Sequence, residues 1–284
     1  MRVVITADLH WNHAKSRESA AAIIDQINAR SDLDALLIVG DVGVADGDSI
    51  EECLARFTFS GPKLFVPGNH ELWTKRPDVD LLGEELPRRI AAAGWHWLPG
   101  APLVREDVAI VGGLGWYDYG FAAESLQIPR EFYAVKASPG AVLYSGQPAE
   151  LVEAARQAGS PSLVARWNDG KFVHLGRPDE AVVERECEQL ARSLALLREA
   201  RSILVATHTV PFAELLPPHH GGQWDFARAY LGSPRLGETI GRFGNVSHVV
   251  CGHSHFAAEA RVGNIRAINV GSGYRAKHLV EVVL

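Results

Sequence analysis

The sequence predicts an α/β fold in which helices cover a layered sheet. Short runs of β-branched and aliphatic residues alternate with longer segments whose apolar residues recur at helical spacing, which is typical of α/β proteins. The chain has 284 residues, of which 47% are hydrophobic and 22% charged. It is therefore long enough to bury a large core, and we expect one domain over residues 1–284.

Buried strands are predicted where short runs rich in β-branched and aliphatic residues occur. The six runs of this kind are RVVIT (2–6), ALLIV (35–39), KLFV (63–66), AIVGG (109–113), ILVAT (203–207) and HVVC (248–251). Three late segments, AAEARV, IRAINV and HLVEVVL, are joined by short links, with VGNI as a hairpin turn between the first two. The chain is therefore expected to close with strands.

Helices are predicted between these strands. Residues 16–30 place Ala20, Ile23, Ile24 and Ile27 at helical spacing, and residues 179–200 repeat the pattern over a longer span. From 116 to 177 the pattern gives way to aromatic residues, Gly and Pro, over a length too great for a plain connection. We interpret this segment as a cap-like insertion beside the functional site.

Composition excludes several classes of protein. The formal net charge of -6 argues against a broad electrostatic grip on long nucleic acid. Three widely spaced cysteines, Cys53, Cys187 and Cys251, give no disulfide framework, which favours a reducing cytoplasm. No apolar run reaches the length of a signal peptide core or a membrane span, so neither secretion nor a membrane partner is predicted.

Polar residues directly follow the predicted strands, in the sequences ADLH, GDVG, PGNHE, THTVP and CGHSH. Because open α/β sheets assemble their sites at the carboxyl ends of strands, one edge is expected to collect these residues. Two-residue spacing within DLH and HSH should turn both side chains of each pair to the same side of a strand end. The residues are Asp8, His10, Asp41, Asn69, His70, His208, His253 and His255.

Imidazole nitrogens mixed with a few carboxylate and amide oxygens suit transition metals such as Mn, Fe, Zn, Co or Ni better than Ca or Mg. The order of the motifs DxH, GDxx, GNH[DE], H and GHxH, from Asp8 to His255, resembles that of the calcineurin-like metallophosphoesterases. The resemblance implies a β-sandwich flanked by helices, in four αββα layers, with two divalent metal ions.

The same resemblance implies a role for each motif residue. One metal ion would be held by Asp8, His10, Asp41 and His255, and the other by Asp41, Asn69, His208 and His253. Asp41 would then bridge the two ions. His70 would not be a ligand but a catalytic proton donor or transition-state stabiliser.

Two features depart from the family pattern. Val44 stands where the family often has the last aspartate of GDxxD, a residue that is not usually a ligand. The segments GWYDY and WNDG, in the insertion, resemble those of a poorly characterised bacterial branch whose substrate cannot be carried over. Substrate-binding residues and oligomeric state therefore stay open.

A charge count suggests the chemistry. Two divalent cations against Asp8 and Asp41 leave about +2, or about +1 with a bridging hydroxide, so the site favours an anion. Neither a GxSxG elbow nor a P-loop is present. We expect hydrolysis of a phosphodiester, or of a phosphomonoester, by hydroxide that bridges two metals, and the substrate could be a nucleotide. The alternatives are a nuclease or nucleotide pyrophosphohydrolase, and a metal-binding scaffold without activity.

Other residues near the motifs have competing interpretations. Glu71 either orients His70 or is a solvent-exposed residue at the start of a helix. His13 lies in the DLH loop but matches no ligand of the family. The aromatic residues Trp116, Tyr117 and Tyr119 are expected to build the core of the insertion rather than stack on a flat leaving group.

Overall fold

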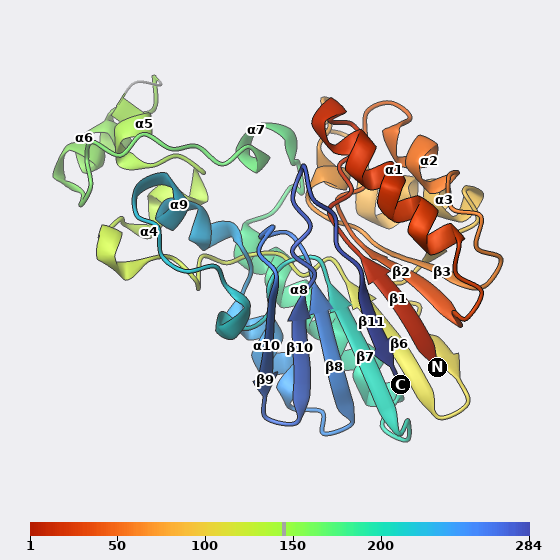
Figure 1. Cartoon of the computed structure of the whole chain (residues 1–284). Helices are drawn as coiled ribbons and strands as arrows, with labels where there is room; N and C mark the ends of the chain where they lie inside the picture. Colours follow the sequence, from red (N-terminus) through yellow and green to blue (C-terminus); the bar gives the residue numbers. More distant parts are fainter. Residues whose placement is uncertain (144–145) are drawn as a thin grey trace.

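Two β-sheets lie face to face, with helices on the outer face of each, in the computed structural model of the chain (Figure 1). The structure describes residues 1–143 and 146–284. The first sheet has the order β11-β1-β2-β3-β4, with bounds Val280–Val283, Arg2–Thr6, Ala35–Val39, Lys63–Val66 and His96–Trp97. The second has the order β5-β6-β7-β8-β10-β9, with bounds Leu103–Arg105, Val108–Gly113, Ser202–Thr207, Val246–Cys251, Ile265–Asn269 and Ala258–Val262.

Most strand pairs are parallel, and this positions the site. Strands β1 to β4 run parallel in the first sheet, with β11 antiparallel to β1. In the second sheet β6, β7, β8 and β10 run parallel, with β5 and β9 antiparallel at its edges. Loops that follow parallel strands leave from one edge of a sheet, so the chain returns repeatedly to the same end of the sandwich.

The alternation of side chains along each strand separates three apolar layers. Val3 and Ile5 of β1 pack between the sheets, in a cluster that also contains Leu204 and Val250 of the second sheet. Val4 points the other way, into the helices that cover the first sheet. A third cluster fills the space between the second sheet and its own helices. The predicted four-layer arrangement is therefore confirmed.

The outer helices are amphipathic and bury one face each. The first sheet is covered by α1 (Ala14–Asn28), α2 (Ser49–Leu54) and α3 (Leu86–Ala92), and the second by α8 (Asp179–Leu196) and α10 (Pro234–Gly241). In α1 the residues predicted at helical spacing, Ala20, Ile23, Ile24 and Ile27, are all buried. The shorter helical elements outside the insertion are η1 (His70–Leu72), η2 (Leu81–Glu85), η4 (Ala213–Leu215), α9 (Gly222–Ala227) and η5 (Arg228–Tyr230).

The segment 116–177 folds into short helices above the carboxyl edge of the sheets (Figure 1). They are η3 (Glu124–Leu126), α4 (Arg130–Ala134), α5 (Pro139–Leu143), α6 (Ala149–Gln157) and α7 (Asp169–Phe172). Residues 144 and 145 of the segment lie outside the described ranges. Trp116 and Tyr117 are fully buried, as expected of core residues. The core they join is the one beneath α1, however, and the insertion has a separate small cluster around Phe132.

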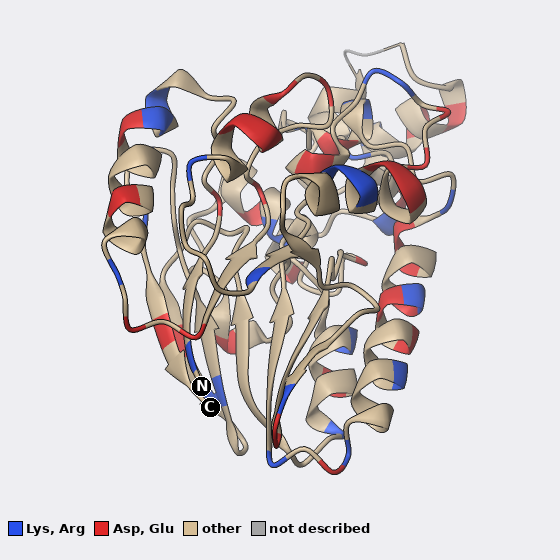
Figure 2. Cartoon of the chain, turned by 90° about the vertical axis from the view of Figure 1, so that its right-hand side faces the viewer, with Lys and Arg blue, Asp and Glu red and all other residues tan. Residues whose placement is uncertain are grey.

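Acidic and basic residues are interspersed along the helices in the view of Figure 2. Within residues 1–143 and 146–284, we find no helix that combines the length and apolarity needed to cross a bilayer.

Candidate metal centre

The residues predicted to form the site lie in loops that follow strands β1, β2, β3, β7 and β8. The loop after β1 carries Asp8 and His10, the loop after β2 carries Asp41, and the loop after β3 carries Asn69 and His70. His208 follows β7, and His253 and His255 follow β8. All except His255 are buried. One edge of the sandwich thus brings the whole predicted set together.

Left-handed backbone turns, rather than strand alternation, direct these side chains. Strand β1 already ends at Thr6, and Asp8 and His10 have positive φ angles of 55° and 46°. The same conformation recurs at Asp41 (57°), His253 (69°) and His255 (55°). The expectation that side-chain alternation at a strand end would align each pair is therefore wrong, because left-handed turns direct these side chains instead. Non-glycine residues in this region carry strain that the surrounding structure must compensate.

Glycines in the motifs allow the loops to approach one another closely. A Cβ atom at Gly68 would lie 2.2 Å from Asp41 Oδ1, and one at Gly252 would lie 2.6 Å from Asp8 Oδ2. Both distances are far below any normal contact to a carbon atom. The glycines before Asn69 and His253 are thus required because carboxylates occupy the space that a side chain would need.

Asp8, His10 and His255 form a first group that could hold a metal ion. The Nε2 atoms of His10 and His255 face each other at 3.0 Å, and His255 Nε2 lies 3.6 Å from Asp8 Oδ1. The backbone N–H of His253 donates to both carboxylate oxygens of Asp8, at 3.0 and 3.2 Å. Asp8 thereby ties the loop after β1 to the loop after β8.

Asp41, His208 and His253 form a second such group. His208 Nε2 lies 3.3 Å from Asp41 Oδ1 and 3.2 Å from His253 Nδ1. Asn69 Oδ1 lies 3.3 Å from the same Nε2 atom. Donor atoms from four different loops therefore converge on one point.

Asp41 faces both groups with different oxygens. Its Oδ1 is directed at His208, whereas its Oδ2 lies 3.8 Å from the Nε2 atoms of both His10 and His70. The backbone N–H of His70 also donates to Oδ1, at 2.9 Å. One carboxylate therefore lies between the two clusters of imidazoles.

The electrostatics of the site suit cations. Burial, together with the charge of Asp41, raises the pKa of Asp8 to about 8. Burial acts in the same direction on Asp41, but His208 and His70 outweigh it and hold the pKa of Asp41 well below its usual range. Burial also lowers the pKa of His253 to about 3 and that of His255 to about 4, so both imidazoles are neutral and have a lone pair to donate.

Unsatisfied buried atoms point the same way. His10 Nδ1 and His70 Nδ1 are buried without a hydrogen-bond partner among the described residues. Closely spaced carboxylates and imidazoles with free nitrogens are the donor set of a transition-metal centre. The residues present therefore fit divalent metal ions.

His13 lies nearer to the site than the sequence suggested. With His10 and His70 it makes a third group of nitrogens that could bind a metal ion. Tyr274 packs against both His10, with ring centroids 4.6 Å apart, and His13, at 5.1 Å. Neither His13 nor Tyr274 belongs to a motif, so sequence reasoning gave them no part in the site.

Glu71 contradicts both interpretations made from the sequence. Its side chain is fully buried, so it is not a solvent-exposed helix start, and among the described residues no hydrogen bond joins its carboxylate to the imidazole of His70. Instead it accepts backbone N–H bonds from the loops after β2 and β3. These donors are Asp41 at 2.8 Å, Val42 at 2.7 Å, Gly43 at 3.0 Å and Gly68 at 2.6 Å. Glu71 therefore fixes the backbone that carries Asp41.

Asp169, at the start of α7, is a component that sequence reasoning missed. It is buried and accepts side-chain hydrogen bonds from Asn69 at 2.9 Å, Trp73 at 2.7 Å, Trp167 at 2.7 Å and Tyr117 at 3.0 Å. The WNDG stretch was visible as a distinctive segment, but no local pattern shows that its aspartate reaches the site. The insertion thus contributes a buried carboxyl group directly behind Asn69.

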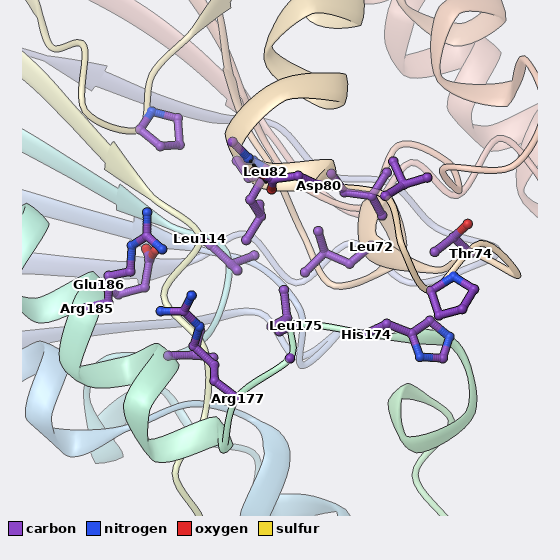
Figure 3. Close-up of a pocket in the computed structure, with 18 of the residues that line it drawn as sticks. Leu72, Thr74, Asp80, Leu82, Leu114, His174, Leu175, Arg177, Arg185 and Glu186 are labelled. Atoms are coloured by element: carbon purple, nitrogen blue, oxygen red, sulfur yellow. Dashed lines mark hydrogen bonds between the residues drawn. The ribbon is translucent and has the colours of Figure 1, made fainter.

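Two cavities flank the turn His70–Leu72. One, of about 840 Å³, opens on Asp41, Asn69, His70, His253 and His255. The other, of about 650 Å³, lies between α8 and η2, where Leu72, Leu82, Leu114 and Leu175 face a common space (Figure 3). Arg177, Arg185 and the buried Glu186 line the α8 side of this second cavity. The predicted site residues are absent from its described lining, so the second cavity is separate from the candidate metal centre.

Comparisons with known proteins agree with this geometry. A family model described as calcineurin-like phosphoesterase matches residues 1–257. No curated protein sequence matches significantly. Among solved structures, a phosphopantetheinyl hydrolase from Mycobacterium tuberculosis aligns with 19% identity and a TM-score of 0.68, over 96% of this chain and 89% of its own.

Two further structures share the fold. A dimetal phosphatase from Danio rerio aligns with 12% identity and a TM-score of 0.57, over 100% of this chain and 92% of its own. A putative 5′-nucleotidase from Staphylococcus aureus aligns with 14% identity and a TM-score of 0.51, over 100% of this chain and 51% of its own. At these identities the likeness shows the fold alone.

Proposed function

The chain belongs to the calcineurin-like phosphoesterase family of phosphoric ester hydrolases, and on that premise we propose that it hydrolyses a phosphodiester, or a phosphomonoester, at a centre of two divalent metal ions. The observation that carries the proposal is the position of Asp41, whose two oxygens face two separate clusters of imidazole nitrogens. A carboxylate in that place is suited to bridge two cations.

We assign the ligands as two sets that share Asp41. Asp8, His10, Asp41 and His255 would hold one ion, and Asp41, Asn69, His208 and His253 the other. The facing nitrogens of His10 and His255, 3.0 Å apart, support the first set, and the convergence of Asn69, His208 and His253 supports the second. When bound, two such ions lower the pKa of water to about 7 and neutralise charge on the phosphoryl oxygens. Manganese is the ion to try first, and iron, zinc, cobalt and nickel suit the same donors.

His70 is proposed as the general acid. Its Nε2 lies 3.8 Å from Asp41 Oδ2, on the side that opens into the cavity. The imidazole stacks on Trp73, with ring centroids 3.8 Å apart, so its orientation is fixed. A positioned imidazole can protonate the oxygen of a leaving alkoxide, which is worth about 10²-fold to 10⁴-fold in rate. This help matters most for a diester, whose leaving group is a poor one.

A nucleotide substrate is the second candidate. The cavity beside the centre has aromatic side chains in its wall, and a flat base could stack on them. The 5′-nucleotidase among the solved structures is compatible with this choice. Long nucleic acid is disfavoured by the net charge of -6. The three free cysteines, two of them buried, suit a reducing cytoplasm, where we propose that the protein works.

The test is turnover by metal-stripped protein reloaded with Mn²⁺, using bis-p-nitrophenyl phosphate and p-nitrophenyl phosphate, with Asp41→Asn as the blank. Cleavage of either ester by the metal-loaded wild type alone supports the proposal. If neither ester is cleaved with Mn, Fe, Zn, Co or Ni while metal is bound, the protein is a metal-binding scaffold and the proposal is wrong.

A further inference from the structure

The cavity beside the metal centre is far larger than a phosphate group requires. Its volume is about 840 Å³, which is the size of cavity that holds a whole small organic molecule. The site residues make up part of its lining. The remaining lining, called here the far end, comes from the insertion, from the segment that leads into and through α9 and from Phe256. The residues at this far end therefore indicate which organic group the substrate carries.

Two tryptophans in the wall are held rigidly. Trp73 and Trp167 both donate their indole N–H to Asp169, at 2.7 Å each. Trp167 also stacks on Tyr230, with ring centroids 5.1 Å apart and planes 5° from parallel. Rings fixed in this way lose little conformational entropy when a ligand binds.

Two further rings at the cavity are uncovered. Trp224 is 73% exposed and Phe256 is 38% exposed, although both residues are large and apolar. Neither ring packs on another aromatic ring in the described ranges, unlike Trp73 and Trp167. Exposed apolar surface that lines a cavity is typical of a ligand-binding site, and indole faces stack well on planar rings.

The charges of the far end are positive. Arg166 and Arg228 line it, and neither forms a salt bridge with a carboxylate among the residues described. Arg228 donates to the carbonyl of Pro217. Its Nε is buried and has no hydrogen-bond partner among the residues that the structure describes. A guanidinium that lines a cavity and has no carboxylate partner is suited to bind an anionic group of a ligand.

We propose that the far end of this cavity is a substrate subsite for an organic phosphate that carries a planar ring and a second anionic group. The ring would lie against Trp224, beside Trp167, and the second anion would pair with Arg228 and Arg166. The subsite rests on the proposed function for its orientation, because the reacting phosphate is placed at the Asp41 end. It adds a substrate class and the residues that select it.

Calorimetric titration of Mn²⁺-loaded protein tests the subsite with three probes. Ribose 5-phosphate has one phosphate and no ring, adenosine 5′-monophosphate adds the ring, and adenosine 3′,5′-bisphosphate adds a second phosphate. We expect the ring to tighten binding by about tenfold to a hundredfold, and the second phosphate by about tenfold or more. Near-equal affinities for all three probes would overturn the proposal.

Affinity ratios within each variant identify the responsible residues. Trp224→Ala should reduce the ratio between the monophosphate and ribose 5-phosphate to near one. Arg228→Gln should reduce the ratio between bisphosphate and monophosphate, and Arg166→Ala, at an exposed position, tests the same effect without disturbing a buried group. Leu196→Ala and Arg261→Ala are matched controls, because both residues are exposed and lie outside the cavity lining.

Turnover of bis-p-nitrophenyl phosphate in the same samples separates the two proposals. If turnover is intact but the affinity ratios of wild type and variants agree, the subsite is wrong and the phosphoesterase proposal stands. If no ester is cleaved but the ratios respond as expected, the phosphoesterase proposal fails and the cavity is still a site for this class of ligand.

Discussion

The buried carboxylate of Asp169 accepts a hydrogen bond at 2.9 Å from the side-chain amide of Asn69, 100 residues earlier in the chain. An amide can present either its oxygen or its nitrogen to a metal ion, and only the oxygen is a ligand. The bond to Asp169 occupies the nitrogen, which leaves Asn69 Oδ1 directed at His208 Nε2. The insertion therefore sets which atom of Asn69, a proposed ligand carried by the sandwich, faces His208.

Asp169→Asn is expected to weaken one of the two metal sites selectively. The new amide would bring N–H groups toward four donors, so that Asn69 loses its fixed orientation. Partners of this kind typically change metal affinity by about 10-fold to 100-fold. Metal stoichiometry and Mn²⁺ affinity, measured by calorimetry, should show one site retained and one weakened.

Asp118→Asn is the matched control for this prediction. Asp118 is also a buried aspartate of the insertion, but it bonds to Ser233 and Gly120 and to none of the proposed ligands. Equal loss of metal in both variants would mean that Asp169 acts only through the stability of the insertion.

His70→Ala should reduce turnover without loss of metal. The imidazole faces Asp41 Oδ2 at 3.8 Å but is proposed to move a proton, so its removal should lower kcat by about 10²-fold to 10⁴-fold. Asp41→Asn should instead abolish turnover and weaken both metal sites. Metal content by elemental analysis and kcat on a chromogenic diester distinguish the two variants, and metal loss from His70→Ala would contradict the role given to His70.

Glu71→Gln should destabilise the fold, because Glu71 accepts four backbone N–H bonds and is fully buried. The amide nitrogen of glutamine would face N–H donors and leave some of them unsatisfied, at a cost of about 2–4 kcal/mol. Urea unfolding of metal-free protein measures this cost. Glu52→Gln, on the exposed side of α2, should leave the midpoint unchanged, and equal midpoints for both variants would refute the assignment.

Glu186 should make stability fall as the pH rises. Burial raises its pKa from 4.5 to about 7, so between these values the folded chain keeps a proton that the unfolded chain has lost. The folded state is favoured below this window and loses up to about 3 kcal/mol across it. Glu186→Gln removes the titrating group. The difference in unfolding free energy between wild type and variant should therefore shift in favour of the variant from pH 4.5 to 7, and a constant difference would contradict the prediction.

The sequence was most informative where local pattern and structure coincide. All six central strands were found because each is a short, mostly apolar run, and the three closing strands because short turn-forming links separate them. The proposed site residues were expected at one edge because parallel strands deliver their loops there, and the structure brings these residues together at that edge. Strands β4 and β5 were missed because they have only two and three residues, which is too few to show a periodic pattern. Glu71 and Asp169 were misread or missed for another reason, since all but one of the partners of each lie 28 to 100 residues away and no local pattern encodes such contacts.

The bond between the backbone of His253 and Asp8 joins residues 245 positions apart. At about 5–20 residues per second, a ribosome that has made Asp8 and His10 needs roughly 10–50 s more before His253 exists. Through that interval neither proposed ligand set is complete, because His208, His253 and His255 have not all been made. On the proposed assignment, enclosure of the metal ions is consequently a late event in biosynthesis, after the second sheet has been made as far as β8.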